Sequence, residues 1–116
     1  MAIEILDTSV TLAEVEKRAE EWYGLMIKGC VDIVKNKVAL GGDYHMESCE
    51  LLVESGSNHN DVWGFNIRFD SSEKGLLEFN SLVNIKPAQG NKSIEIENQE
   101  IVKRAGDIIR TWIIYG

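Results

Sequence analysis

Apolar residues recur at helical spacing in three separate parts of the chain. The first part predicts a helix over residues 12–23, which begins at a capping box formed by Thr11 and Glu14. The second part predicts a short helix over residues 45–55. The third part is the most regular. It follows Asn98 as a candidate N-cap, and its apolar stripe is wide enough to cover a sheet.

Strict alternation of apolar and polar residues predicts two neighbouring strands over residues 62–70 and 76–86. The polar stretch between them has the composition of a turn. Because a slip of one residue would turn an apolar face to water, the register must keep both apolar faces buried. We expect the pairing that sets Arg68 opposite Glu78.

Two further strand signals lie in the first half of the chain. Residues 3–7 fit a short strand, and residues 31–40 fit a β-hairpin whose turn contains Asn36, a residue that tolerates positive φ. The alternative is a first helix that extends to Val34. That helix would have to contain two glycines, each at a cost of about 1 kcal/mol relative to alanine.

In chain order the elements read β-α-β-β-α-β-β-α. This order predicts an α+β fold with a mostly antiparallel sheet and with the helices packed on one face. The length of 116 residues fits one compact domain over residues 1–116, and no proline-rich linker divides it.

Charge and hydropathy narrow the possible partners. Nineteen acidic residues against twelve basic ones give a net charge of −7, which excludes a general nucleic-acid binder that neutralises phosphates. No apolar run approaches the ~18 residues of a membrane span, and the first ten residues lack the features of a secretory signal. We therefore expect a cytoplasmic protein with neither a nucleic-acid nor a membrane partner.

No residue belongs to a specific catalytic, cofactor-binding or metal-binding motif, so none is assigned to these roles. Cys30 and Cys49 are expected to remain reduced, buried thiols. Asp43, His45 and Glu50 lie close together in sequence, which is compatible with a divalent metal site or with acid–base chemistry. The competing interpretation is a solvated acidic helix face.

Polar side chains on the predicted strands and in the loop over residues 87–93 give the best candidate for a ligand site. Asparagine is depleted in strands, so its presence there suggests that the amide has a partner. That partner is a neighbouring loop or solvent in one interpretation and a ligand in the other. Because the loop is locally basic, the ligand expected there is a small anion. The candidate ligand-binding residues are His45, Asn66, Asn84, Gln89, Asn91 and Lys92.

Four stretches of the chain are distinctive when taken together: VDIVKNKVALGGDYH (31–45), LLVESGS (51–57), DVWGFNI (61–67) and EFNSLVNIKPAQGNKS (78–93). They resemble a family of small prokaryotic proteins of uncharacterised function. The resemblance spans most of the chain, and it implies a single compact domain and supports the predicted hairpin. It implies no activity, so no catalytic residue is carried over.

Two classes of function follow as expectations. The first is a small binding or interaction module that self-associates, because Ile114 and Tyr115 fall outside the apolar stripe of the last helix and suggest a homodimer contact. The alternative is a small enzyme, or a small-molecule or anion-binding protein, with a polar site between residues 41–50 and 84–93. This alternative predicts that His45 lies close to the second segment. No cofactor is implied.

Overall fold

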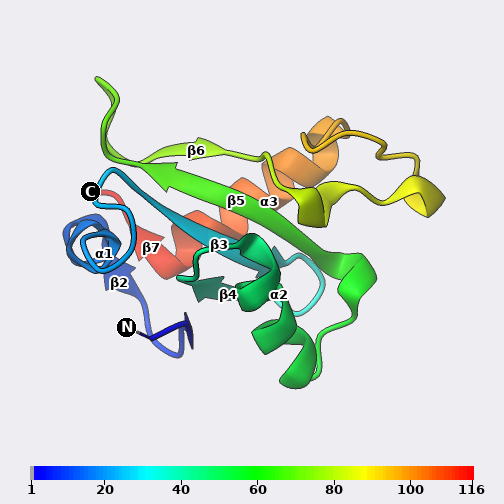
Figure 1. Cartoon of the computed structure of the whole chain (residues 1–116), viewed down its shortest axis with the longest axis horizontal. Coiled ribbons are helices and arrows are strands. Elements are labelled where there is room, and N and C mark those ends of the chain that lie inside the picture. Colours follow the sequence, from blue (N-terminus) through cyan, green and yellow to red (C-terminus); the bar gives the residue numbers. More distant parts are fainter. Residues whose placement is uncertain (1) are drawn as a thin grey trace.

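The computed structural model describes residues 2–116, which form a five-stranded sheet with helices on both of its faces (Figure 1). The helices are α1 (Leu12–Ala19), α2 (His45–Glu54) and α3 (Gln99–Trp112). The short 3-10 helices are η1 (His59–Asp61), η2 (Leu82–Asn84) and η3 (Pro87–Gln89). The strands are β1 (Glu4–Ile5), β2 (Val10–Thr11), β3 (Met26–Asp32), β4 (Lys37–Leu40), β5 (Val62–Arg68), β6 (Leu76–Glu78) and β7 (Ile113–Ile114). The predicted α+β class is confirmed.

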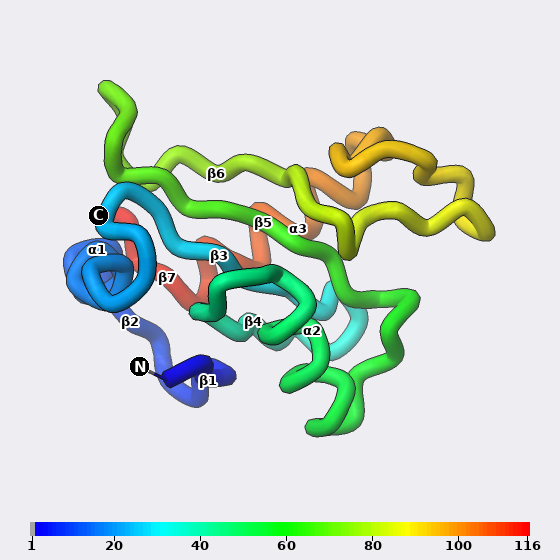
Figure 2. The backbone as a smooth tube through the Cα atoms, viewed as in Figure 1, coloured from blue at the N-terminus to red at the C-terminus, as the bar shows by residue number. Residues whose placement is uncertain are grey.

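All neighbouring strands of the sheet run antiparallel, in the order β1-β4-β3-β5-β6. The central strands β3 and β5 pair along their full lengths, whereas the edge strands β1 and β6 have only two and three residues. Edges this short offer little backbone for pairing with another chain. The segment after β6 continues past the end of the sheet before it returns to α3 (Figure 2). Within residues 2–116, no helix is both long and apolar enough to cross a membrane.

The prediction that the helices share one face of the sheet is wrong. α1 and α3 cover one face, where Trp63 and Phe65 of β5 pack in the main core with Val15 of α1 and Ile109 of α3. α2 covers the other face, over a second core that includes Cys30 of β3 (Figure 1). The reason is that β5 is buried at six successive positions, and a strand buried on both sides needs a cover on each side.

Small residues let α2 approach the sheet closely. Cys30, Ala39 and Gly64 all lie on the face that α2 covers, and all three are buried. A Cβ atom added at Gly64 would lie 2.5 Å from the Cβ and Oγ of Ser81 and 3.3 Å from Cδ2 of His45. Glycine at this position therefore allows α2 and the start of η2 to meet over β5.

Local predictions for the first hairpin and the last helix are confirmed. β3 and β4 form the hairpin, and Asn36 adopts the left-handed region with a φ of 58°. The alternative extension of the first helix is wrong, because α1 ends at Ala19. α3 begins after Asn98, whose Oδ1 accepts a hydrogen bond from the backbone N–H of Glu100 at 2.9 Å.

The C-terminal residues pack largely within the monomer. Ile113 is buried, and β7 pairs with β2 in parallel. The hydroxyl of Tyr115 donates to the carbonyl of Gly75 at 2.6 Å, so this ring is used inside the fold. Ile114 stays half exposed. The apolar surface that the C-terminal residues offer to a second chain is therefore smaller than the sequence suggested. The homodimer stays a prediction.

The pairing of β5 with β6 has the expected parity but a different register. Arg68 lies opposite Leu76, two residues from the predicted partner Glu78. Burial of one face fixes only whether the register is odd or even, and the turn then selects among the even registers. Gly75 closes this turn with a φ of 86° and donates its N–H to the carbonyl of Arg68 at 2.7 Å. The predicted partners still meet diagonally, with Arg68 Nη1 3.4 Å from Glu78 Oε1.

The strand predicted over residues 76–86 ends early, because β6 stops at Glu78. Ser81 caps the start of η2, and its Oγ accepts the backbone N–H of Val83 at 3.1 Å. The side chain of Asn84 then replaces a strand partner for β5. Its Oδ1 accepts the N–H of Gly64 at 2.7 Å, and its Nδ2 donates to the carbonyl of Gly64 at 3.1 Å. We call this pair of bonds the Asn84–Gly64 clamp.

Removing the clamp should destabilise the fold strongly. Asn84→Ala leaves the backbone N–H and C=O of Gly64 without partners in a buried place, which should lower the free energy of unfolding by about 2–4 kcal/mol. Urea denaturation measures this change. Asn60→Ala is the matched control, because Asn60 is exposed and its side chain makes no hydrogen bond within residues 2–116; about 0.5 kcal/mol or less is expected. Equal losses in the two variants would contradict the role of the clamp.

Candidate functional site

An apolar hollow of about 320 Å³ lies between the first turn of α2 and η2. Leu82 is 77% exposed, Tyr44 72% and Met46 41%, although all three side chains are large and apolar in most of their surface. Adjacent exposed apolar side chains are typical of ligand or partner sites. The residues that line this α2–η2 hollow are Lys28, Tyr44, His45, Met46, Ser81, Leu82 and Val83.

His45, the first residue of α2, is held against β5 by its ring. Its Nε2 lies 3.0 Å from the carbonyl oxygen of Phe65 and 2.7 Å from Oδ1 of Asn66. Asn66 in turn donates from Nδ2 to Oδ1 of Asn80 at 2.7 Å. Because both partners of Nε2 are acceptors, the neutral ring carries its proton on Nε2 and keeps a lone pair on Nδ1.

The protonation state of His45 follows from its surroundings. Burial lowers the pKa of His45 below its ordinary value of 6.5, and the positive charge of Lys28 acts in the same direction. The hydrogen bonds to Asn66 and to the carbonyl of Phe65 oppose this effect only in part. At pH 7 the imidazole is therefore neutral, and it offers an acceptor or a base rather than a cation.

Lys28 of β3 brings a positive charge to the same hollow. Its Nζ donates to the carbonyl of Asp43 at 2.8 Å and lies 5.2 Å from the ring centre of Tyr23 and 5.7 Å from that of Tyr44. The hydroxyl of Tyr23 donates to the same carbonyl at 2.6 Å. These contacts orient the ammonium group at the edge of the hollow, where the aromatic faces stabilise it.

Ser81 lines the hollow but is not placed as a nucleophile for His45. The carbon Cδ2 is the His45 ring atom nearest to the position of a Cβ added at Gly64, and Ser81 packs over the same position. The Oγ of Ser81 accepts the backbone N–H of Val83 instead. A serine that pairs with histidine in catalysis needs a ring nitrogen within hydrogen-bond reach. The structure therefore gives Ser81 the role of a helix cap.

The six residues proposed from the sequence as ligand-binding residues divide into two groups. His45 and Asn66 are joined by a hydrogen bond beside the hollow. The other four serve the scaffold or lie away from it. Asn84 forms the clamp on Gly64, and Asn91 donates to the carbonyls of residues 84, 93 and 95. Gln89 donates to the carbonyl of residue 60, and Lys92 is exposed on the loop. The structure places His45 beside residues 81–83, which directly precede the segment over residues 84–93 that was expected to lie close to it.

Lys86, directly before the loop over residues 87–93, points into the protein. Its Nζ donates to the carbonyl of His59 at 3.0 Å and lies 5.2 Å from the ring centre of Trp63. Burial lowers the pKa of Lys86. Cys30 and Cys49 are free thiols buried between α2 and the sheet, and burial raises the pKa of Cys30 well above its usual range. Such a thiol stays protonated and unreactive.

The acidic residues near His45 have other uses. The Oε1 of Glu47 accepts the backbone N–H groups of Asp43 and Tyr44, at 2.9 and 3.0 Å, and so caps the start of α2. Glu50 is exposed on α2. In the part of the chain that the structure describes, no group of three or more His, Cys, Asp or Glu side chains is arranged to hold a metal ion.

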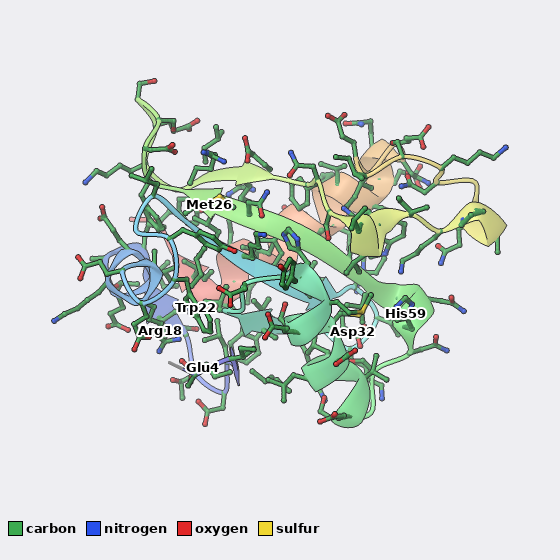
Figure 3. The ribbon with its side chains drawn as sticks, viewed as in Figure 1. Glu4, Arg18, Trp22, Met26, Asp32 and His59 are labelled. Carbon is green, nitrogen blue, oxygen red and sulfur yellow. The ribbon has the colours of Figure 1, made fainter. Side chains whose placement is uncertain are left out.

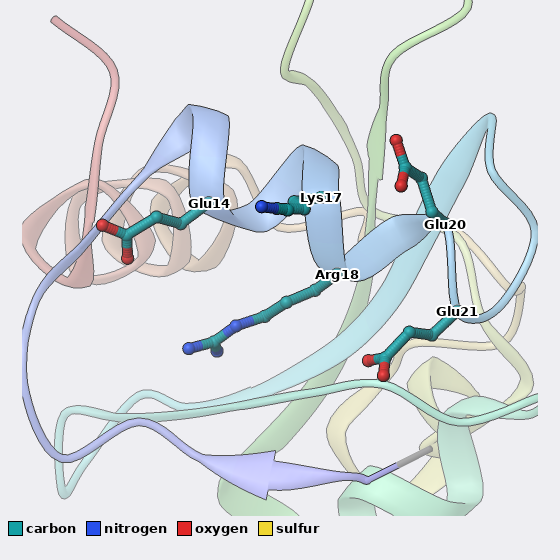
Figure 4. A pocket seen from close by; sticks show the side chains of 5 residues that line it. All are labelled: Glu14, Lys17, Arg18, Glu20 and Glu21. Carbon is teal, nitrogen blue, oxygen red and sulfur yellow. The ribbon is translucent and has the colours of Figure 1, made fainter.

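A larger hollow of about 560 Å³ lies beside α1 (Figure 4). Its lining residues all belong to α1 and the turn after it, so the hollow has a single wall of mixed charge. Arg18 is also engaged in an ion pair with Glu4 of β1 (Figure 3). Ligand sites have convergent walls that carry apolar side chains, whereas this hollow has one wall and all of its lining side chains are charged. Its lining residues are Glu14, Lys17, Arg18, Glu20 and Glu21.

Residues 4–112 match the family described as "Protein of unknown function (DUF5674)". The chain belongs to this family. The resemblance to an uncharacterised single-domain family is thereby confirmed, and membership in DUF5674 brings no activity with it. No curated protein and no solved structure matches the chain.

Of the seven residues that line the hollow in this DUF5674 protein, sequence reasoning missed six: Lys28, Tyr44, Met46, Ser81, Leu82 and Val83. One of them carried a usable signal. Leu82 is an apolar residue on the polar side of the strand predicted over residues 76–86, where its neighbours on that side are Asn80 and Asn84. An apolar side chain in such a place is exposed unless another element or a ligand covers it. Lys28 gave no comparable signal.

The depressed pKa of His45 predicts a specific dependence of stability on pH. Below about pH 6.5 the unfolded chain binds a proton at His45 while the folded chain does not, so the free energy of unfolding should fall as the pH falls. His45→Gln keeps an N–H donor for Asn66 but removes the titrating group. It should lose less stability than the wild type between pH 7.5 and 5.5, as measured by urea denaturation.

His59→Gln is the matched control for this prediction, because His59 is exposed and its side chain makes no hydrogen bond within residues 2–116. This variant keeps His45 and should show the same loss of stability as the wild type over that pH range. A wild-type loss that His45→Gln fails to reduce would contradict the placement of His45.

Proposed function

We propose that this protein is a small ligand-binding module and that its site is the α2–η2 hollow. One observation carries the proposal: an imidazole held in a single orientation by Phe65 and Asn66 stands in the wall of an apolar hollow. Sites for small molecules combine a mostly apolar lining with a few fixed polar groups. The hollow also lies between two segments that overlap or adjoin those expected to enclose a polar site.

The exposed side chains of the hollow support a binding role better than a folding role. Leu82 and Tyr44 are mostly in water, so they contribute little apolar burial to the fold. A ligand that covers them gains roughly 25 cal/mol for each Å² of apolar surface removed from water. Neutral His45 adds a polar group whose orientation is already fixed, which lowers the entropic cost of binding.

A thermal-shift screen tests the proposal. The wild type is screened against short-chain organic acids, alcohols, nucleotides and divalent metal salts, and at least one class should raise the melting temperature. A ligand at a hundredfold its Kd stabilises the folded state by about 2.7 kcal/mol. Leu82→Asn removes the most exposed apolar wall, so it should abolish the shift without unfolding the protein.

The matched control is Leu25→Asn, which makes the same substitution at an exposed leucine (59%) outside the lining of the hollow. It should respond to ligand as the wild type does. Light scattering accompanies the screen, because a homodimer that covers Leu82 would also be lost in Leu82→Asn. A screen without any shift, or equal shifts in both variants, would refute the proposed site.

A second candidate function is a small enzyme at the same site, favoured by the lone pair that His45 keeps on Nδ1. A histidine that is unprotonated at pH 7 can act as a general base that takes a proton from water as the water attacks a bound ester. Hydrolysis of p-nitrophenyl hexanoate is the test. Exposed histidines hydrolyse such esters slowly, so activity must fall in His45→Gln and persist in His59→Gln. Equal rates in the two variants would leave binding as the function.

A further inference from the structure

We infer that the ligand of the α2–η2 hollow is a small organic anion, a monocarboxylate with an apolar chain or ring. The inference rests on the proposed function, and it adds the chemical class of the ligand. It follows from three features of the lining: its charge, its remaining hydrogen-bond donors and its size.

The charge of the lining is opposite to that of the whole protein. Among the lining residues, all of them in the described part of the chain, Lys28 is the sole charged side chain at pH 7, and no carboxylate faces the hollow. The complete chain has a net charge of −7. An isolated positive charge at an apolar hollow on an acidic protein attracts an anion and disfavours a cation.

The ammonium group of Lys28 is placed to bind a carboxylate. It has three N–H donors, and the structure uses one of them on the carbonyl of Asp43. Tyr23 and Tyr44 approach it with their ring faces, which stabilise the charge without accepting all of its hydrogen bonds. Two donors remain for charge-assisted hydrogen bonds to a carboxylate, which are about twice as strong as neutral ones.

A neutral apolar ligand fits the hollow less well than an anion does. It would cover Tyr44, Met46 and Leu82, but it would also remove water from the ammonium group of Lys28 without supplying an acceptor. Burial of a charge without a partner is costly. The volume of about 320 Å³ lies at the small end of the usual range for ligand pockets, roughly 300–1,000 Å³. A short-chain acid is therefore the expected size.

The test compares three ligands that share a six-carbon chain: sodium hexanoate, 1-hexanol and hexylammonium chloride. Each is titrated into the ¹⁵N-labelled full chain, and the backbone amide shifts of residues 44–46 and 81–83 give the Kd. Hexanoate should bind about tenfold or more tightly than hexanol, as expected for one charge-assisted contact, and hexylammonium should bind most weakly.

Two variants at Lys28 test whether its positive charge causes the preference for hexanoate over hexanol. Lys28→Gln should remove the preference for hexanoate over hexanol, because it removes both the charge that binds the carboxylate and the charge that a neutral ligand leaves without a partner. Lys28→Arg keeps the charge and should keep the preference for hexanoate. The second variant guards against a simple loss of structure at the start of α2, where Lys28 holds Asp43.

The possible results test the proposed ligand class and the proposed site independently. If all three compounds bind equally well and shift residues 44–46 and 81–83, the hollow is a binding site but the anionic class is wrong. If Lys28→Gln keeps the preference for hexanoate, the assignment to Lys28 is wrong. If none of the compounds shifts these amides, the inference fails. The proposed function fails with it only if the wider thermal-shift screen is also negative.

Discussion

The two hydrogen bonds between the side chain of Asn84 and the backbone of Gly64 hold the candidate site together. β5 loses its partner strand where β6 turns away, and the amide of Asn84 satisfies the backbone at that point. Its Nδ2 also reaches the carbonyls of Phe79 and Ile94, at 3.4 and 3.1 Å, so one buried amide joins three segments. A buried polar group with all its partners in place is rigid. The position of Leu82 beside His45 therefore depends on this clamp.

A second buried asparagine, Asn91, satisfies backbone groups in the segment that follows η2 in the same way. Asn91 donates to the carbonyls of Asn84 and Glu95 at 2.7 and 2.8 Å, and its Oδ1 accepts the N–H of Glu97 at 2.8 Å. Segments without regular strand pairing would otherwise leave backbone groups unsatisfied in a buried place. These amides are used on backbone, so the surface left for a ligand consists of apolar side chains, Lys28 and one oriented histidine.

How much of the structure the sequence predicts depends on how far apart in sequence the interacting residues lie. The N-cap at Asn98 and the hairpin turn at Asn36 are set by neighbours in sequence, and both are found in the predicted places. The register beside Arg68 and the face covered by α2 depend on tertiary packing, which periodicity does not report. Similarly, Asn66 belongs to the candidate site whereas Asn84 belongs to the scaffold, although both read as asparagines within strands. Only their partners distinguish them, and those partners lie about 20 residues away.

The location of the hollow follows from the way α2 covers only part of its face of the sheet. Where α2 packs, that face carries small residues such as Cys30 and Ala39. Beyond the first turn of α2, β3 carries Lys28 and β5 carries Asn66 in directly paired positions, and the face becomes polar. The hollow lies at this boundary, so one side of any bound molecule meets apolar side chains and the other meets the ammonium group of Lys28. A boundary of this kind selects a ligand that is itself divided into an apolar part and a charged end.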